Sequence, residues 1–288
     1  MIAKVAGLCM LSILQLTLIE FAGAQKKEPA VSPTSKTKWN LIWSDEFNYS
    51  GLPDTSKWSY DIGSSGWGNH ELQNYTNGNL ENVHVHNGSL YLTARKQNHG
   101  DVLIEKSARY TSARMVSKFK GDWKYGKIEA RAILPKGVGV WPAIWMLPTD
   151  WKYGGWPASG EIDIMENVGY IKDTVFGTVH TKAYNHIIHT QKGGSLFVKN
   201  SAAKFHIYAV EWTPESIAFL IDGKPYYYFP NEHKSSAEWP FDQHFHLLMN
   251  IAVGGDWGGK FGVDDRIFPA TMKVDYIRVF NYDLPVKP

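Results

Sequence analysis

The stretch that decides the fold is Glu161-Ile162-Asp163-Ile164-Met165-Glu166, which places three carboxylates among aliphatic residues. Such a stretch predicts a β-strand, in which side chains alternate between the two faces. Glu161 and Asp163 then share one face, while Glu166 would point to the other. One extra residue, a β-bulge at Ile164 or Met165, returns Glu166 to the first face, and bulges are over-represented beside active sites. The stretch therefore predicts a bulged strand with three acids on one face.

The alternative is a solvent-exposed edge strand whose acids only keep the protein soluble. Ile162, Ile164 and Met165 disfavour it, because they would be exposed at such an edge. They suit a central strand with a core on one face and a wet groove on the other. A catalytic role for the acids is therefore the preferred interpretation.

The spacing of the two glutamates indicates how they could act. Five residues at about 3.3 Å each, less about one rise for the bulge, put their Cα atoms about 13 Å apart. If each carboxyl leans inward by roughly 4 Å, the gap narrows to around 5 Å, the separation found in retaining glycosidases. One glutamate would be the nucleophile and the other the general acid and base, with Asp163 between them. Such crowded carboxylates cannot all ionise freely, so we expect at least one raised pKa.

The rest of the chain predicts an all-β fold. Segments with strand character recur between turn signals, at residues 89–94, 126–133, 160–166, 174–180, 205–212, 216–221, 245–253 and 272–282. Ile221-Asp222-Gly223-Lys224 predicts a hairpin with an Asp-Gly turn. Along the last strand, alternation puts Val274 and Tyr276 on one side and Asp275 on the other. Long helical periodicity is absent, so we expect one domain built as a sandwich of two antiparallel sheets.

The first 24 residues have the features of a secretory signal. Lys4 lies near the start, an apolar stretch runs from about Val5 to Leu18, and Ala22-Gly23-Ala24 offers a small-residue cleavage site. The apolar part is too short to span a bilayer comfortably. Residues 25–38 are rich in Pro, Ser and Thr and predict a flexible leader, which leaves residues 39–288 as the single domain. We therefore expect a secreted protein, extracellular or periplasmic, without a membrane span.

Charge and composition exclude several classes of partner. The single cysteine, Cys9, lies within the signal, so the mature chain would be held together by its core rather than by disulfides. The net charge is +2 and the longest basic run is Lys26-Lys27, which disfavours nucleic acid. Twelve Trp, 15 Tyr and 13 Phe exceed the usual aromatic content, and several Trp lie in Gly and Pro loops, where they could stack on sugar rings. Nothing indicates more than a monomer.

Two further patterns, a Gly-rich run and a set of histidines, resemble a phosphate loop and a zinc site but lack residues or spacings that those sites require. The run from Gly254 to Phe261 has a Gly, four residues and then Gly-Lys, yet Phe261 stands where a phosphate loop needs Ser or Thr. A loop that shapes a cleft around Trp257 fits better. The histidines that could suggest zinc have no standard ligand spacing, at positions His84, His86, His180, His186 and His189. We expect His180, which ends the strand after the acids, to lie beside Glu166.

These motifs together resemble glycoside hydrolase family 16, and in particular its laminarinase branch, the endo-β-1,3-glucanases. The resemblance covers essentially the whole mature domain. It runs through Trp43-Ser-Asp-Glu-Phe47, Gly66-Trp-Gly-Asn-His-Glu71, Tyr110-Thr-Ser-Ala-Arg114, Tyr125-Gly126, Trp141-Pro-Ala-Ile-Trp145, Glu161-Ile-Asp-Ile-Met-Glu166, Gly155-Trp-Pro157, Val179-His-Thr181, Trp239-Pro-Phe241, Gly254-Gly-Asp-Trp-Gly258 and Val274-Asp-Tyr-Ile-Arg-Val279. Residues 184–199 and 231–238 match nothing specific to the branch.

The resemblance implies a concanavalin-like β-jelly roll with the carboxylates on the concave sheet of a substrate cleft. Glu161 would be the nucleophile, Asp163 its assistant and Glu166 the acid and base. Sugar-binding positions would be Asn69, Arg114, Trp141 and Trp145 on the non-reducing side, His180 near the leaving group, and Trp123, Trp156 and Trp257 as further cleft aromatics. No cofactor is needed for catalysis, but many relatives bind a structural calcium ion, which here would use Glu46, the Gly88 carbonyl and Asp275.

The substrate implied is a β-1,3-glucan such as laminarin. A mixed-linkage β-1,3-1,4-glucanase or an algal galactan hydrolase is the alternative within the family, and the cleft tryptophans favour glucan. A non-catalytic glucan-binding protein would be expected to lose one or both glutamates, and both are present here. Net transglycosylation differs only in whether sugar or water attacks the intermediate, so it stays open.

Overall fold

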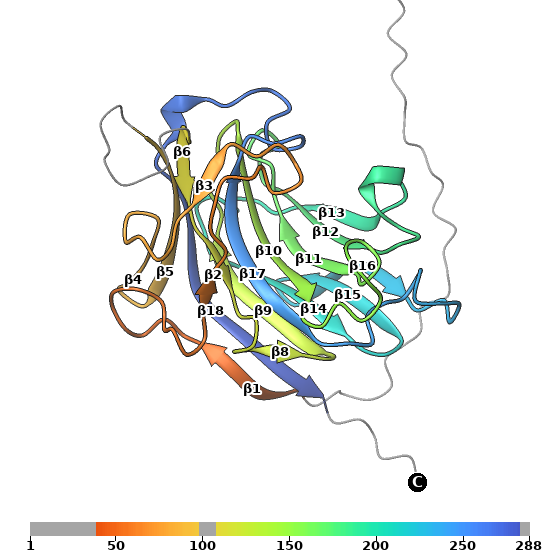
Figure 1. The fold of residues 1–288 in the computed structure, drawn as a ribbon. Helices are drawn as coiled ribbons and strands as arrows, with labels where there is room; N and C mark the ends of the chain where they lie inside the picture. The colour runs from red at the N-terminus through yellow and green to blue at the C-terminus, as the bar shows by residue number, and fades with distance from the viewer. Residues whose placement is uncertain (1–38, 98–107, 283–288) are drawn as a thin grey trace, which may run out of the picture. The chain divides into compact units, whose positions relative to one another are not determined.

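The computed structural model describes residues 39–97 and 108–282, and most of the regular structure there is β-sheet (Figure 1). The predicted signal and leader, residues 1–38, lie outside the described residues. In the described ranges the helical elements are two short 3-10 turns, η1 (His186–Ile188) and η2 (Asp265–Ile267). None of the described helices is long and apolar enough to cross a membrane.

Two sheets account for the strands of the described part. The first has ten strands, in the order β16 (Lys224–Pro230), β15 (Ser216–Ile221), β14 (His206–Trp212), β9 (Gly126–Ile133), β18 (Ala270–Tyr282), β5 (Ser89–Lys96), β6 (Tyr110–Ser112) and β3 (Gln73–Tyr75), with β1 (Trp39–Asp45) beside β18 and β4 (Val83–His86) beside β5. The second has eight, in the order β13 (Lys192–Phe197), β12 (Thr174–His180), β11 (Glu161–Glu166), β10 (Val140–Pro148), β17 (Phe245–Val253), β7 (Arg114–Val116) and β2 (Ser59–Tyr60), with β8 (Asp122–Trp123) beside β17. The pairs are antiparallel apart from β3 with β6, so the predicted two-sheet sandwich is confirmed.

The core lies between the sheets, where alternate residues of each strand are buried. Ile128 and Val274 of the first sheet and Ile162, Met249 and Ile251 of the second are fully buried members of one hydrophobic cluster. All eight segments predicted as strands are strands. Alternation therefore identified the half-buried strands correctly, because a sheet with one face on a core leaves this period in its sequence.

The predicted hairpin turn at Asp222-Gly223 is confirmed, whereas the predicted regular alternation along β18 is wrong. The Asp222-Gly223 hairpin is confirmed, since Ile221 pairs with Lys224 and both turn residues have positive φ. The alternation was wrong beyond Val274. Asp275 is an extra residue between the paired positions Val274 and Tyr276, so the buried face continues at Ile277 and Val279. A bulge shifts every later side chain to the other face.

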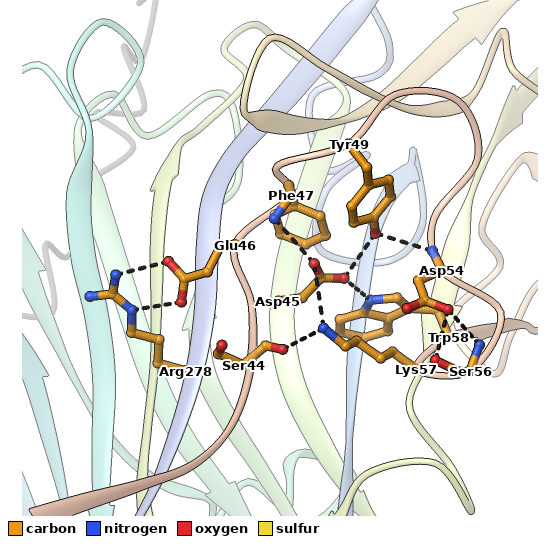
Figure 2. A network of polar contacts seen from close by, with 10 residues as sticks. All are labelled: Ser44, Asp45, Glu46, Phe47, Tyr49, Asp54, Ser56, Lys57, Trp58 and Arg278. Atoms are coloured by element: carbon orange, nitrogen blue, oxygen red, sulfur yellow. Dashed lines mark hydrogen bonds and ion pairs between the residues drawn. The ribbon is translucent and has the colours of Figure 1, made fainter.

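Asp45 anchors the loop that follows β1 (Figure 2). This carboxylate is 1% exposed and accepts hydrogen bonds from the Phe47 backbone N–H, the Tyr49 hydroxyl and the Trp58 indole, at 3.1, 2.9 and 2.8 Å. Lys57 Nζ lies 3.9 Å away. Buried carboxylates are tolerated when their oxygens are bonded in this way. The network therefore fixes residues 45–58 against the first sheet.

The second sheet positions the acids. Strand β11 lies between β10 and β12, and β10 lies between β11 and β17, in the middle of the sheet (Figure 1). Central strands are held by hydrogen bonds on both sides, so side chains that they carry are placed with little freedom. The outer face of these strands therefore offers a rigid floor for a site.

Candidate active site

The bulge predicted in β11 is present, and its extra residue is Ile164. On β10 the adjacent residues Ile144 and Trp145 pair with Met165 and Asp163, so Ile164 has no partner of its own. Against β12 the register is interrupted between Asp163 and Glu166 in the same way. All three acids consequently point to the outer face of the sheet.

The three acids line one cavity of about 470 Å³. The cavity is walled by Trp67, Gly68, Asn69, Glu71, Arg114, Trp141, Ala143, Trp145, Leu147, Trp151, Trp156, Glu161, Asp163, Glu166, His186, Ile187, Asn250 and Ala252. A larger cavity of about 580 Å³, near Lys136 and Thr271, contains none of the predicted site residues. The chemistry-bearing groups are therefore gathered in the smaller cavity, among tryptophans.

Each glutamate receives a hydrogen bond from an indole. Trp156 Nε1 donates to Glu161 Oε2 at 2.7 Å, and Trp141 Nε1 donates to Glu166 Oε1 at 2.9 Å. A donor that bonds a carboxylate favours its ionised form and fixes its orientation. The two glutamates are thus oriented separately, from opposite ends of the bulged strand.

The pKa values of all three acids are raised, as expected. Burial, followed by the charge of Asp163, raises the pKa of Glu161 to about 8, although His180 and Trp156 oppose the shift. Burial raises the pKa of Glu166 to about 7 against the effects of His180 and Trp141. Burial and the charge of Glu166 raise the pKa of Asp163 well above its usual range. The cluster therefore retains protons near neutral pH, which an acid catalyst requires.

His180 lies opposite Glu161, which corrects the prediction that it lies beside Glu166. In the antiparallel pair, the first residue of β11 faces the last residue of β12, so Glu161 pairs with His180. Its Nε2 is 3.3 Å from Asp163 Oδ2 and 3.9 Å from Glu161 Oε1. The imidazole thus lies next to the two acids at the start of the strand, and it also lowers the pKa of Glu166.

Arg114 is packed between two indoles at the other side of the cavity. Its guanidinium carbon lies 4.6 Å from the ring centroid of Trp67 and 4.8 Å from that of Trp145, and its Nε donates to Asp61 at 3.0 Å. Cation–π contacts and an ion pair hold the side chain in place. Arg114 and Trp145 are therefore brought together in this cavity, which Asn69 also lines, and their role as sugar-binding residues stays a prediction.

The three other tryptophans predicted to line the cleft, Trp156, Trp257 and Trp123, have different positions. Trp156 is in the cavity wall. Trp257 instead supports the wall, because its ring packs edge to face on Trp141 and on Phe176, with centroids 5.4 and 5.0 Å apart. Trp123 is not a cleft aromatic, since it is 8% exposed and packs on Trp43.

The Gly-rich run 254–259 shapes the cavity, as expected for the alternative to a phosphate loop. A Cβ on Gly258 would lie 2.8 Å from Trp141 Cβ, and one on Gly254 would lie 2.7 Å from Leu72. The Asp256 backbone N–H donates to the Asn69 carbonyl at 2.8 Å. Glycine is favoured at Gly254 by its φ of 70° and at Gly258 by the Gly254 carbonyl oxygen, which would lie 2.6 Å from a Cβ.

Several cavity residues were not predicted as site residues, among them Trp67, Glu71, Trp151, His186, Ile187 and Asn250. Asn250 accepts from Trp145 Nε1 at 2.7 Å and donates to the Tyr75 hydroxyl at 3.0 Å, and Tyr75 in turn lies 3.4 Å from Glu71. An amide within the apolar strand Phe245–Val253 is a signal that could have identified Asn250. Burial raises the pKa of Glu71, but its sequence context gives no comparable signal.

The carboxylates predicted to bind calcium have other partners. Arg278 donates to both oxygens of Glu46, at 3.0 and 2.8 Å (Figure 2), and Arg131 lies 2.6 Å from Asp275. Gly88 lies in the turn between β4 and β5 with φ of 69°. Calcium takes about six to eight oxygen ligands, and in this arrangement both carboxylates are paired with guanidinium groups instead. Calcium binding therefore stays a prediction from the resemblance.

Comparison with known proteins identifies relatives along most of the chain. The family model described as glycosyl hydrolases family 16 matches residues 70–278. A beta-glucanase of Rhodothermus marinus is 55% identical over 251 residues, which are 85% of this chain and 86% of that protein. Among solved structures, the laminarinase from Rhodothermus marinus has a TM-score of 0.83 and 52% identity, covering 86% of this chain and 99% of that one. A mutant of SCLam, a non-specific endo-β-1,3(4)-glucanase, co-crystallised with an oligosaccharide, has a TM-score of 0.82 and 44% identity, covering 85% of this chain and 96% of that one.

Proposed function

The chain belongs to glycosyl hydrolase family 16, and from that premise we propose that it is an endo-β-1,3-glucanase that cleaves laminarin-type glucan with retention of configuration. The observation that carries the proposal is the bulge at Ile164, which brings Glu161 and Glu166 to one face of a central strand. Each of the two carries its own indole donor. Two separately oriented carboxyl groups are what double displacement at an anomeric carbon requires.

Glu166 acts first as the general acid and protonates the glycosidic oxygen. Its raised pKa of about 7 supports this role, because the carboxyl still holds its proton near neutral pH. Glu161 attacks the anomeric carbon from the other side and forms a glycosyl-enzyme. Glu166, now ionised, removes a proton from the water that hydrolyses this intermediate.

Asp163 allows Glu161 to be ionised. It is 2% exposed, and burial together with the charge of Glu166 raises its pKa well above the usual range, so we propose that it is neutral when the enzyme acts. Once Asp163 is neutral, the repulsion that raises the pKa of Glu161 is removed. Trp156 and His180 then favour the carboxylate form of Glu161, which is the nucleophilic form.

The substrate class is supported by the cavity wall. Trp67, Trp141, Trp145 and Trp156 present indoles, and flat rings suit the C–H faces of glucose units. A mixed-linkage β-1,3-1,4-glucanase is the second candidate, since SCLam, whose structure overlays with a TM-score of 0.82, is described as non-specific for β-1,3(4)-glucan. A non-catalytic glucan-binding role is disfavoured, because all three acids are retained.

We also propose that residues 1–24 are a secretion signal and that the mature catalytic domain, residues 39–288, acts outside the cytoplasm after a leader of residues 25–38. The support is the sequence pattern of these segments. Mass spectrometry of the exported protein should find a chain that starts at Gln25. A retained N-terminal segment would contradict this part of the proposal.

Two experiments test the activity. Products from laminarin, lichenan, agarose and carrageenan, analysed for size and linkage, should show release of oligosaccharides from laminarin, with lichenan as the substrate that separates the two glucanase candidates. Glu161→Ser should lose hydrolysis while it stays folded and retains oligosaccharide binding, since the change removes the nucleophile and little packing. A Glu161→Ser variant that still hydrolyses laminarin would refute the assignment of the nucleophile.

A further inference from the structure

The start of the acid strand and the end of its neighbour form a compact group of donor atoms. In the described ranges, one donor atom each of Glu161, Asp163 and His180 lies within 4.8 Å of the other two. The three come from paired positions on β11 and β12 and lie on a rigid sheet. This group was not predicted from histidine spacing, because two of its three donors are carboxylates and the third is brought in by strand pairing.

One of the three separations already matches that of a tetrahedral transition-metal site. Zinc binds imidazole nitrogen and carboxylate oxygen at about 2.0–2.2 Å, so two ligands across a tetrahedral angle lie about 3.4 Å apart. His180 Nε2 and Asp163 Oδ2 are 3.3 Å apart, and His180 Nε2 and Glu161 Oε1 are 3.9 Å apart. A small rotation of the Glu161 side chain, which is 16% exposed, would bring the third ligand to the same separation.

The bonding state of these atoms points to a ligand independently of their spacing. Asp163 is 2% exposed, and its Oδ2 accepts no hydrogen bond from the described residues, although it faces His180 Nε2. A buried carboxylate oxygen left without a hydrogen bond costs free energy. A cation between Asp163 and His180 would satisfy it and would also offset the mutual repulsion of the acids.

We propose that Glu161, Asp163 and His180 bind a divalent cation of the late first transition row, such as Zn²⁺, and that this ion inhibits the enzyme by occupying the nucleophile. Three protein ligands leave a fourth position for water, as in open zinc sites. A Glu161 carboxylate that donates its electron pair to the metal cannot attack an anomeric carbon. Binding of the ion therefore excludes productive binding of the substrate, and binding of the substrate excludes the ion.

The ligand set also predicts which ions do not bind. Calcium and magnesium take oxygen ligands, about six or more of them, and an imidazole nitrogen with two carboxylates is a poor match. Imidazole ligands favour zinc, copper, nickel and cobalt. Inhibition should thus follow the nature of the ion and not its charge.

Binding is tested directly on the purified mature protein without a histidine tag. Titration with ZnCl₂ in a calorimeter should give one site per chain, and Co²⁺ should give the visible absorption of a tetrahedral complex. His180→Gln and Asp163→Asn should each weaken zinc binding by tenfold or more. His233→Gln is the matched control, because its imidazole lies 2.8 Å from Glu215 on the exposed surface and should leave the site intact.

Inhibition is tested on the wild type with laminarin. Zn²⁺ should raise KM without changing kcat, EDTA added after zinc should restore the rate, and Ca²⁺ at the same concentration should have no such effect. The inhibition rests on the proposed function, whereas the calorimetry does not. Zinc binding without glucan hydrolysis would support the site and refute the function; hydrolysis with zinc binding that His180→Gln and Asp163→Asn leave unchanged would refute the site alone.

Discussion

Replacing Glu166 with Gln should stabilise the folded protein at neutral and higher pH while it removes the general acid. Burial raises the pKa of Glu166 from its ordinary 4.5 to about 7. Each step of one in pKa corresponds to about 1.36 kcal/mol, so holding this carboxyl ionised in the folded state costs at most about 3.4 kcal/mol. Asp163 and Glu161 titrate together with it, so part of this cost belongs to the cluster as a whole, and we take about 2 kcal/mol for Glu166 alone. The amide oxygen of Gln can still accept from Trp141, so little else is lost.

The sign of the pH dependence follows from the direction of the shift. Because the pKa is higher in the folded than in the unfolded state, the folded protein binds the proton more tightly. The cost is absent below about pH 4.5, grows as the pH rises to about 7 and is complete above that. Glu166→Gln should therefore match the wild type at pH 4.5 and exceed its stability at pH 8.

Differential scanning calorimetry at pH 4.5 and pH 8 measures the difference. About 2 kcal/mol corresponds to roughly 4–8 °C in melting temperature for a chain of this size. Asp150→Asn, a change at an exposed carboxylate outside the cavity, is the control and should shift the melting temperature by less than about 2 °C, since surface substitutions usually have small effects. A Glu166→Gln variant that is less stable than wild type at pH 8, or equally shifted at both pH values, would refute the reasoning.

Three further predictions concern the acid and the anchor of the fold. The kcat/KM for laminarin should fall as the pH rises through about 7, because Glu166 then loses the proton that it must donate; a rate that stays constant from pH 6 to 9 would exclude this role. Trp141→Phe removes a hydrogen bond that lowers the pKa of Glu166, so this fall should move to higher pH, and a fall at the same pH would show that the indole does not tune the acid. Asp45→Ala leaves the Trp58 indole and the other donors of that network without their buried acceptor. Urea titration should therefore find the free energy of unfolding reduced by about 2–4 kcal/mol. A loss below about 0.5 kcal/mol would mean that Asp45 does not anchor this loop.

The strand, its bulge and the face of the acids could be predicted because each depends on neighbouring residues. Alternation in Glu161 to Glu166 fails by one position, and a bulge is the local device that corrects it. Trp141 and Trp145 lie four residues apart in an extended strand, so their shared face also follows from sequence. Both results hold in the structure.

Contacts between distant segments could not be predicted in the same way. The partner of His180 depends on the register between β11 and β12, and the sequence does not show that register. The hydrogen bond from Asn250 to the Tyr75 hydroxyl joins residues 175 positions apart. The bulge at Asp275 leaves no clear signal in the sequence, because the residues on both sides of it are mixed in polarity and fit a shifted pattern as well as a regular one.

The composition of the acid strand also explains how it can tolerate its own charge. Ile162, Ile164 and Met165 are 0–1% exposed on the core side of the same six residues. Fully burying side chains of this size contributes about 1.5–3 kcal/mol each, and together these contributions exceed the cost of at most about 3.4 kcal/mol for one ionised Glu166. A regular strand would place Glu166 on the core side, where its desolvation would be uncompensated. The extra residue Ile164 therefore has two effects. Its apolar side chain adds to the core, and its insertion turns Glu166 into the cavity.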